Sequence, residues 1–519
     1  MPEGPDLAVH PGSRHHTLLT SNEPPEDTDT VFIQSVISEC DGRLAYLEDE
    51  ILKLQDQLKQ LEEERQSLLL YRTQNIAILS PVRRIPTEIL NDIFWWTLPP
   101  IRDDSNLDRS RFDFRNSPWL LTHISPRWRA ISIATPSLWS RIVVDYAEIH
   151  RTSISQCHTP STADYLSLVR AQIQRSPRLK IHFYAFPDMD SRPQIQMFEL
   201  LSQHCSRWEE LSLGLASKIP LSLTALRDRL PSLRRLWLQW DEPESVQSLL
   251  DCFRAASSLV EVGVFDECHH VPFLLPAPQL TRYELTGPWS THERILQGAP
   301  NLVEAHIDIA SDPEISSDTL IELQHLRRLY ISAPEILSVL KAPALEELAV
   351  SLYTGEGPSY LERLRGFVDR SLCPLRRICH RGVPETHTTI QILKTFPSLT
   401  ELVMIMHDAG SEVSTLISAL RPGESTVVAP QLQSLLLGFE VHDTPDWAAY
   451  FDMLKARWEA KNCTLKHAAL ITRGNSSPDS LILDGLLALR QEGLDFILPE
   501  NDSESLGFIN AWLYGTTWN

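Results

Sequence analysis

Five consecutive residues combine the side-chain types that bind transition metals: Asp266, Glu267, Cys268, His269 and His270. Carboxylate, thiolate and imidazole groups are the usual zinc ligands, and a structural site is commonly built from two such paired halves. The sequence offers no second half for this cluster. We therefore predict a loop at the end of a strand here, with no metal ligands.

Catalytic motifs are absent from the sequence. We find no glycine-rich phosphate loop, no zinc-protease helix and no nucleophile elbow, and 19 glycines in 519 residues leave little material for such loops. We predict a protein that is not an enzyme, with no catalytic residues and no cofactor.

Composition excludes other classes. A net charge of −21 argues against nucleic acid as a partner, because such binding depends on neutralising phosphates. The eight cysteines are scattered, the N-terminus has no secretory pattern, and no apolar run approaches the roughly 20 residues of a membrane-spanning helix. We expect a protein of the cytoplasm, the nucleus or both, without membrane attachment.

Residues 80–141 contain two amphipathic stretches. Pro86 and Glu88 favour a helix start, and the following apolar residues recur every three or four positions. A second stretch covers 118–134 and is followed by Thr135-Pro136-Ser137-Leu138-Trp139. So small a helical unit cannot bury all of its large side chains, which favours a partner or a neighbouring domain.

This stretch resembles the F-box in the version common in fungal proteins. The match opens with Ile85-Pro86-Thr87-Glu88-Ile89-Leu90 and Ile93-Phe94, and closes with Trp128-Arg129 and Thr135 to Trp139. It departs from the family at Ser125, where a cysteine is usual, at Pro126, which interrupts a helix, and in a long insert over 101–116. The resemblance implies docking to the Skp adaptor of a cullin–RING ubiquitin ligase through these residues: Ile85, Pro86, Ile89, Leu90, Ile93, Phe94, Trp119, Leu120, Ile124 and Trp128.

The N-terminal region divides into a tail and a helix. Residues 1–30 are rich in proline and acidic residues and are predicted to be disordered. Residues 31–75 carry a heptad repeat typical of a coiled coil. Its two core positions hold Ile37, Leu44, Ile51, Leu58 and Arg65, and Cys40, Leu47, Leu54, Leu61 and Leu68. Either two chains form a homodimer through residues 37–68, or a single helix folds back on the F-box.

A short leucine-containing motif recurs from residue 142 onward at intervals of roughly 19 to 33 residues, as in 231–238 and 258–264. It resembles the degenerate leucine-rich repeats of F-box proteins, without the usual asparagine. We predict a solenoid over 142–440, with helices such as 245–256 and 388–395 between the strands. Residues 441–519 continue and cap it, with helices 445–458 and 480–491 and strands 464–471 and 494–498.

The complete prediction is an α/β protein. It has an N-terminal coiled-coil helix, a small all-α F-box and an α/β leucine-rich-repeat solenoid with a parallel sheet.

Aligned repeats place alternating charges at one strand position. In chain order the residues are Glu210, Arg235, Glu261, Arg282, Glu304, Arg328, Glu347, Arg377 and Glu401. Neighbouring parallel strands lie about 4.8 Å apart, so equal register would bring each cation between two carboxylates. We predict that these nine residues form one row in sequence order on the concave face.

The same strand face is predicted to carry the substrate-binding residues, because aromatic side chains often anchor partners. These residues are Trp237, Gln239, Phe265, His306 and Tyr330. Loops that cover them are the competing explanation.

Two functions follow from these patterns. The first is the substrate-recognition subunit of a Skp–cullin–F-box ubiquitin ligase, with the F-box bound to the adaptor and an unidentified protein substrate on the repeats. The second is a non-catalytic scaffold that assembles partners through the coiled coil and the repeats.

Overall fold

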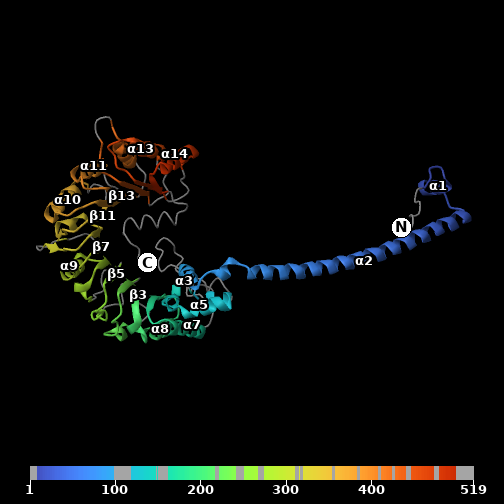
Figure 1. Ribbon diagram of the computed structural model, residues 1–519, viewed down its shortest axis with the longest axis horizontal. Helices are drawn as coiled ribbons and strands as arrows, with labels where there is room; N and C mark the ends of the chain where they lie inside the picture. The colour runs from blue at the N-terminus through green and yellow to red at the C-terminus, as the bar shows by residue number, and fades with distance from the viewer. Residues whose placement is uncertain are drawn as a thin grey trace. The chain divides into compact units, whose positions relative to one another are not determined.

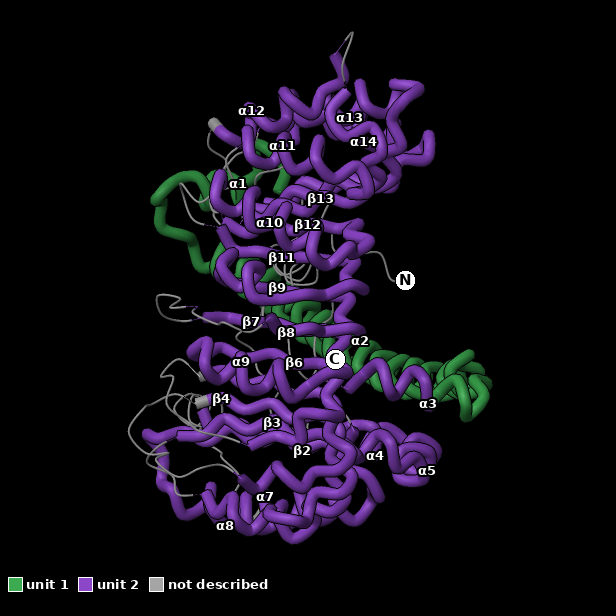
Figure 2. Tube along the Cα trace, turned by 90° about the vertical axis from the view of Figure 1, so that its left-hand side faces the viewer, with its two compact units in different colours: residues 1–90 green, residues 91–519 purple. Residues whose placement is uncertain are grey.

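The computed structural model describes residues 9–98, 118–147, 149, 162–216, 221–240, 251–266, 274–309, 315, 320–352, 357–382, 386–406, 411–423, 427–439, 446–472 and 478–497. The chain divides into two compact units, Met1–Leu90 and Asn91–Asn519, each described by itself (Figure 2). The insert at 101–116 and residues 267–270 of the predicted metal-free loop lie outside the described residues.

The first unit is dominated by one helix. Helix α2 (Asp27–Ile78) has 52 residues, none of them buried, and is preceded by α1 (Arg14–Thr20) and followed by a 3-10 turn at Pro81–Arg84. Composition predicts disorder through residue 30, yet α1 and the start of α2 are helical. Ser13 caps α1 by accepting the His16 N–H, and Arg14 forms ion pairs with Glu23 at 2.7 Å and Asp29 at 3.2 Å.

Short helices follow around the unit boundary, which falls within α3 (Thr87–Trp96). Next come α4 (Leu121–Ile124), α5 (Pro126–Ala134) and a 3-10 turn at Pro136–Trp139. Ser125 separates α4 from α5 because its hydroxyl accepts the Trp128 N–H at 3.2 Å, while Pro126 opens α5. The predicted interruption at Pro126 is therefore confirmed.

In the described residues, the second unit is built on one long parallel sheet of fourteen strands. Its order follows the chain, and every pairing is parallel. The strands are β1 (Arg141–Asp145), β2 (Leu179–Tyr184), β3 (Trp208–Leu215), β4 (Arg235–Trp240), β5 (Glu261–Asp266), β6 (Arg282–Thr286), β7 (Glu304–Asp308), β9 (Arg328–Ile331), β11 (Glu347–Leu352), β12 (Arg377–Gly382), β13 (Glu401–Met406), β14 (Ser434–Phe439), β15 (His467–Ile471) and β16 (Asp495–Ile497). A separate parallel pair joins β8 (Ile321–Glu322) to β10 (Leu340–Lys341).

Helices lie on the outer side of this curved sheet (Figure 1). They are α7 (Thr162–Arg175), α8 (Ser191–Ser202), α9 (Trp289–Gly298), α10 (Gly357–Ser371), α11 (Thr386–Thr395), α12 (Ser411–Leu420), α13 (Trp447–Glu459) and α14 (Ser480–Gln491). Four elements match their predictions: α11, α13, α14 and β16. The helix predicted over 245–256 is wrong in its described part, because residues 252–255 form turns.

The main core lies between the sheet and these helices. Alternate strand residues such as Leu213, Val264 and Leu402 point toward the helices and are at most 1% exposed. Each such side chain contributes roughly 1.5–3 kcal/mol through burial. Among the described helices, none has both the length and the apolar character to cross a membrane.

One glycine is required by backbone contact. Gly382 ends β12 at φ +111°, and a Cβ atom there would lie 2.0 Å from the carbonyl oxygen of Leu352 on the neighbouring strand. A side chain would therefore force the two strands apart as well as strain the backbone.

We expect Gly382→Ala to lower the free energy of unfolding by about 2 kcal/mol or more in urea denaturation. Gly366→Ala is the matched control, because Gly366 lies inside α10 with nothing within 4 Å of its added Cβ. That control should raise stability by about 0.5–1 kcal/mol. Equal effects of the two variants would contradict this account.

Candidate functional site

Helix α3 carries two apolar stripes that differ in solvent exposure. Leu90 and Phe94, four residues apart, are 1% and 0% exposed. Ile89, Ile93 and Trp96 lie along a neighbouring stripe and are 50%, 40% and 85% exposed. Since successive residues are rotated by about 100°, the helix buries one apolar stripe and presents the other to solvent.

The remaining predicted adaptor-binding residues divide in the same way. Leu120 and Ile124 are exposed at 45% and 51%, as is Pro86, whereas Ile85 and Trp128 are half-buried. Phe94 packs against Trp128 with ring centroids 4.8 Å apart. The prediction that Leu90, Phe94 and Trp119 contact the adaptor is therefore corrected, because all three side chains lie in the core.

Trp119 is buried because it joins the short helices to the start of the sheet unit. Its ring lies 5.0 Å from that of Trp139, and the Arg175 guanidinium lies over both rings. Its Nε1–H donates to Gln172 Oε1 at 3.2 Å, while Gln172 Nε2 donates to the Arg141 carbonyl at 2.6 Å. This packing leaves Trp119 only 9% exposed.

The predicted row of alternating charges is confirmed. Strand pairing places each of the nine residues directly beside the next in chain order, from Glu210 and Arg235 on β3 and β4 to Arg377 and Glu401 on β12 and β13. We call these nine residues the charge row. It lies on the strand face opposite to the helix-facing side chains, since its members alternate with residues such as Leu236 and Ile378.

Ion pairs connect neighbours in the row. Arg377 lies between two carboxylates, with Nη1 at 3.0 Å from Glu347 and Nε at 2.9 Å from Glu401. Arg235 similarly lies 4.0 Å from Glu210 and 3.1 Å from Glu261. Two further pairs join Arg282 to Glu304 at 3.4 Å and Arg328 to Glu347 at 3.2 Å.

Two histidines on the same face reinforce the row. His182 Nε2 lies 3.2 Å from Glu210, and His306 Nε2 lies 2.9 Å from Glu304. Burial alone would raise the pKa of each of these two carboxyl groups, but the histidine contacts and nearby cations lower the pKa below its usual 4.5. Both carboxylates therefore remain charged at neutral pH.

The contact between His182 and Glu210 was not predicted from the sequence. His182 lies two residues after Lys180 and so on the same strand face, and Lys180 pairs in register with Glu210, which is the sequence feature that could have indicated this contact.

The predicted substrate-binding residues share this strand face but differ in access. Trp237, His306 and Tyr330 are 7%, 4% and 6% exposed, whereas Gln239 and Phe265 are half-buried. Strand pairing aligns His306 with Tyr330, whose ring centroid is 5.9 Å from the histidine ring. Of the five, Gln239 and Phe265 are thus the residues best placed to touch a partner.

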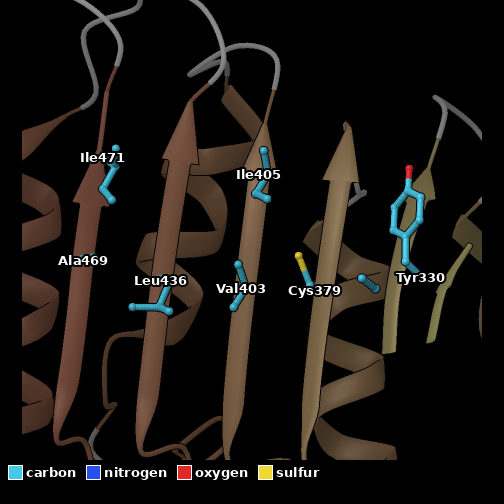
Figure 3. Close-up of a cluster of buried hydrophobic side chains, with 8 residues drawn as sticks. Tyr330, Cys379, Val403, Ile405, Leu436, Ala469 and Ile471 are labelled. Carbon is cyan, nitrogen blue, oxygen red and sulfur yellow. The ribbon is translucent and has the colours of Figure 1, made fainter. Parts of the chain in front are cut away.

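On the C-terminal strands, this face carries an apolar cluster next to the charge row. On each strand from β12 to β15, the residue two positions C-terminal to the level of the charge row is apolar and at most 6% exposed. In chain order these residues are Cys379, Val403, Leu436 and Ala469. Figure 3 shows these side chains beside Ile405, Ile471 and Tyr330. On β12 and β13 the charge row and the apolar cluster therefore lie side by side on the same strands.

Two histidines are buried on the opposite, helix-facing side. Tyr360 of α10 hydrogen-bonds His380 Nε2 at 3.1 Å, and Tyr283 hydrogen-bonds His292 Nδ1 at 3.0 Å. His292 Nε2 also lies 3.3 Å from the Asp308 carbonyl oxygen, which can only accept, so its proton lies on Nε2. Burial lowers the pKa of His292 and of His380 from 6.5 to about 4.

Comparison with known proteins gives little further information. No family model matches the sequence, and no curated protein matches it. Among solved structures, the chain is similar to "Crystal structure of TLR13-ssRNA13 complex", with 15% identity and a TM-score of 0.27. That match covers 58% of this chain and 46% of the other, so the chain spans less than half of that protein's length.

The charge row generates one prediction. Arg377→Glu would place three carboxylates side by side, and we expect urea denaturation to show a loss of about 1–3 kcal/mol in unfolding free energy. Arg376→Glu, on the exposed neighbouring residue, should change it by less than about 0.5 kcal/mol.

Adding Glu401→Arg to Arg377→Glu should recover part of the loss, since it restores one opposite-charge pair. A double variant no more stable than the additive expectation would refute coupling within the row.

The buried histidines generate a pH prediction. Below about pH 6.5, His292 and His380 become protonated in the unfolded chain, whereas in the folded protein both stay neutral until about pH 4. Each histidine therefore lowers the free energy of unfolding as the pH falls toward 4. The loss should reach roughly 2 kcal/mol per histidine near pH 5. It is measured by urea denaturation at neutral and acidic pH.

His380→Gln keeps an acceptor for Tyr360 but cannot titrate, and should reduce this pH dependence. His387→Gln changes an exposed histidine of α11 and should leave it unaltered. If both variants show the wild-type pH dependence, the buried histidine is not its source.

Proposed function

We propose that this protein is the substrate-recognition subunit of a Skp–cullin–F-box ubiquitin ligase. The observation that carries the proposal is the solvent-facing apolar stripe of α3, formed by Ile89, Ile93 and Trp96 within the stretch that resembles an F-box. Large apolar side chains left in water at consecutive turns of one helix favour a protein partner. Leu120 and Ile124 add exposed apolar surface in the same stretch.

The helix also has the internal support that a docking surface needs. Leu90 and Phe94 are buried, and Thr135 Oγ1 lies 2.9 Å from Asn91 Oδ1. These contacts fix the face of α3 opposite to the exposed stripe. Binding of the Skp adaptor would therefore not require α3 to change its orientation.

The second unit supplies the substrate surface in this proposal. Its parallel strands, stacked in chain order with leucines facing the helices, support a leucine-rich-repeat solenoid. We place substrate contact around Phe265, Gln239 and the accessible members of the charge row, such as Arg235 and Arg328, whose side chains are 35% and 39% exposed. A partner with charged groups of both signs fits this surface.

The mechanism requires no bond chemistry from this chain. By holding a substrate and the adaptor at once, it raises the effective concentration of substrate lysines near the ubiquitin-transfer enzyme. The protein would act in the cytoplasm, the nucleus or both, where the cullin–RING ligase is present.

A scaffold without adaptor binding is the second candidate. It is favoured by the exposed heptad of α2, which offers a separate assembly surface. Adaptor binding distinguishes the two functions.

We expect purified full-length protein to bind a purified Skp adaptor, and the variant Ile89→Asp/Ile93→Asp to weaken binding by at least about 100-fold in calorimetry, as for loss of central apolar contacts. Both positions are exposed, so its thermal midpoint should stay near that of the wild type. Leu90→Asp, in contrast, should destabilise the fold, because that side chain is 1% exposed.

Leu481→Asp is the matched control, since Leu481 of α14 is 81% exposed and lies far along the chain from α3. It should bind the adaptor as well as the wild type does. A wild-type protein with no measurable affinity for the adaptor would reject the ligase proposal in favour of the scaffold.

A further inference from the structure

Helix α2 leaves a long apolar seam in solvent. Its 52 residues extend about 78 Å, and none of them is buried. The seam consists of the aliphatic residues at the two heptad core positions, which are 42–63% exposed: Ile37, Leu44, Leu47, Ile51, Leu54, Leu58, Leu61 and Leu68. A continuous seam of this kind is costly to leave in water over so many turns.

We propose that a second copy of this chain covers the seam, through a parallel, in-register coiled coil over residues 37–68. The spacing of three and four residues is that of knobs-into-holes packing between two helices. Leucine fills four of the five second core positions, while Ile37 and Ile51 occupy first positions, a combination that favours two parallel strands. The proposal stands independently of adaptor binding.

Charges beside the seam favour this orientation. In a parallel pair, Arg43 faces Glu48 of the second copy across the seam. The next two flanking pairs are Glu50 with Gln55 and Gln57 with Glu62, neither of them a like-charge pair. Each pairing occurs twice by symmetry, so the two copies attract without any repulsive pair at these positions.

The antiparallel arrangement is less favourable with the same core layers. It would bring Asp41 of one copy next to Glu62 of the other, twice by symmetry, and so introduce like-charge repulsion. Its one type of attractive flanking pair, Arg43 with Glu64, only offsets this repulsion, whereas the parallel arrangement has an attractive pair and no repulsive one at the flanking positions. Charge complementarity therefore selects the parallel pairing.

Arg65 further constrains the register, because it is the one charged residue in the core positions. In the parallel pair its guanidinium lies beside Glu64 of the other copy, which offsets the approach of the two arginines. A shift by one heptad would instead place Arg65 against Leu58 or beyond the seam, leaving the charge among aliphatic side chains.

Cys40 provides a direct reporter of orientation. It occupies a second core position and is a free thiol of intermediate exposure. In the parallel pair the two Cys40 residues face each other within the Cα separation that a disulfide needs. In the antiparallel pair Cys40 faces Arg65 instead.

We expect light scattering on the full-length protein to give twice the mass of one chain. Leu54→Glu at a core position should give the monomer mass, with at least about a 100-fold weaker dimer. Leu52→Glu is the matched control, because Leu52 and Leu54 are 60% and 62% exposed on the same helix but Leu52 lies outside the seam. Circular dichroism checks that both variants fold.

Mild oxidation with diamide should then join two full-length wild-type chains through a disulfide, with two thiols oxidised and diamide reduced. Cys40→Ser should abolish this cross-link while the protein remains dimeric by light scattering. A monomeric wild type, or equal disruption by Leu52→Glu and Leu54→Glu, would overturn the proposed seam. A dimer that forms no cross-link through Cys40 would overturn its parallel register.

Discussion

The second unit depends on one constraint, which is equal register between consecutive parallel strands. A slip by one residue would turn every leucine of a strand away from the helices and bring charged side chains into the core. The charge row adds an electrostatic penalty to such a slip, because each arginine pairs in register with glutamates on both sides. Individual exposed pairs contribute little, but a connected row of partly buried pairs is more effective than isolated ones.

Surfaces that remain apolar in solvent are concentrated before the sheet begins. Helix α3 uses Leu90 and Phe94 internally and leaves Ile89, Ile93 and Trp96 exposed, while α2 buries none of its residues. Sheet strands, by contrast, bury nearly all their aliphatic side chains, including the aliphatic cluster centred on Val403. This division is what the proposed function requires, with partner contacts on the N-terminal helices and substrate contacts on the sheet.

Much of this arrangement was predictable from the sequence, because period and register are local properties. The charge row followed from aligning the repeats at single positions, and α11 and α14 followed from their apolar spacing. Burial was less accessible to prediction. Periodicity cannot tell that Phe94 faces Trp128 while Ile93 faces solvent, since both belong to the same apolar pattern. The low exposure of Trp119, Trp237, His306 and Tyr330 could not be predicted for the same reason, because it depends on side chains distant in sequence.

The alternation of sign along the charge row has a consequence for how such a chain can grow. Removing one unit, for example the strand bearing Arg328, would bring Glu304 beside Glu347 and create a repulsive step. Removing two adjacent units would rejoin opposite charges and leave the pattern intact. Duplication or deletion of an even number of repeat units within this stretch should therefore be tolerated, and that of an odd number should be selected against. Repeats of this kind are expected to be gained and lost in pairs.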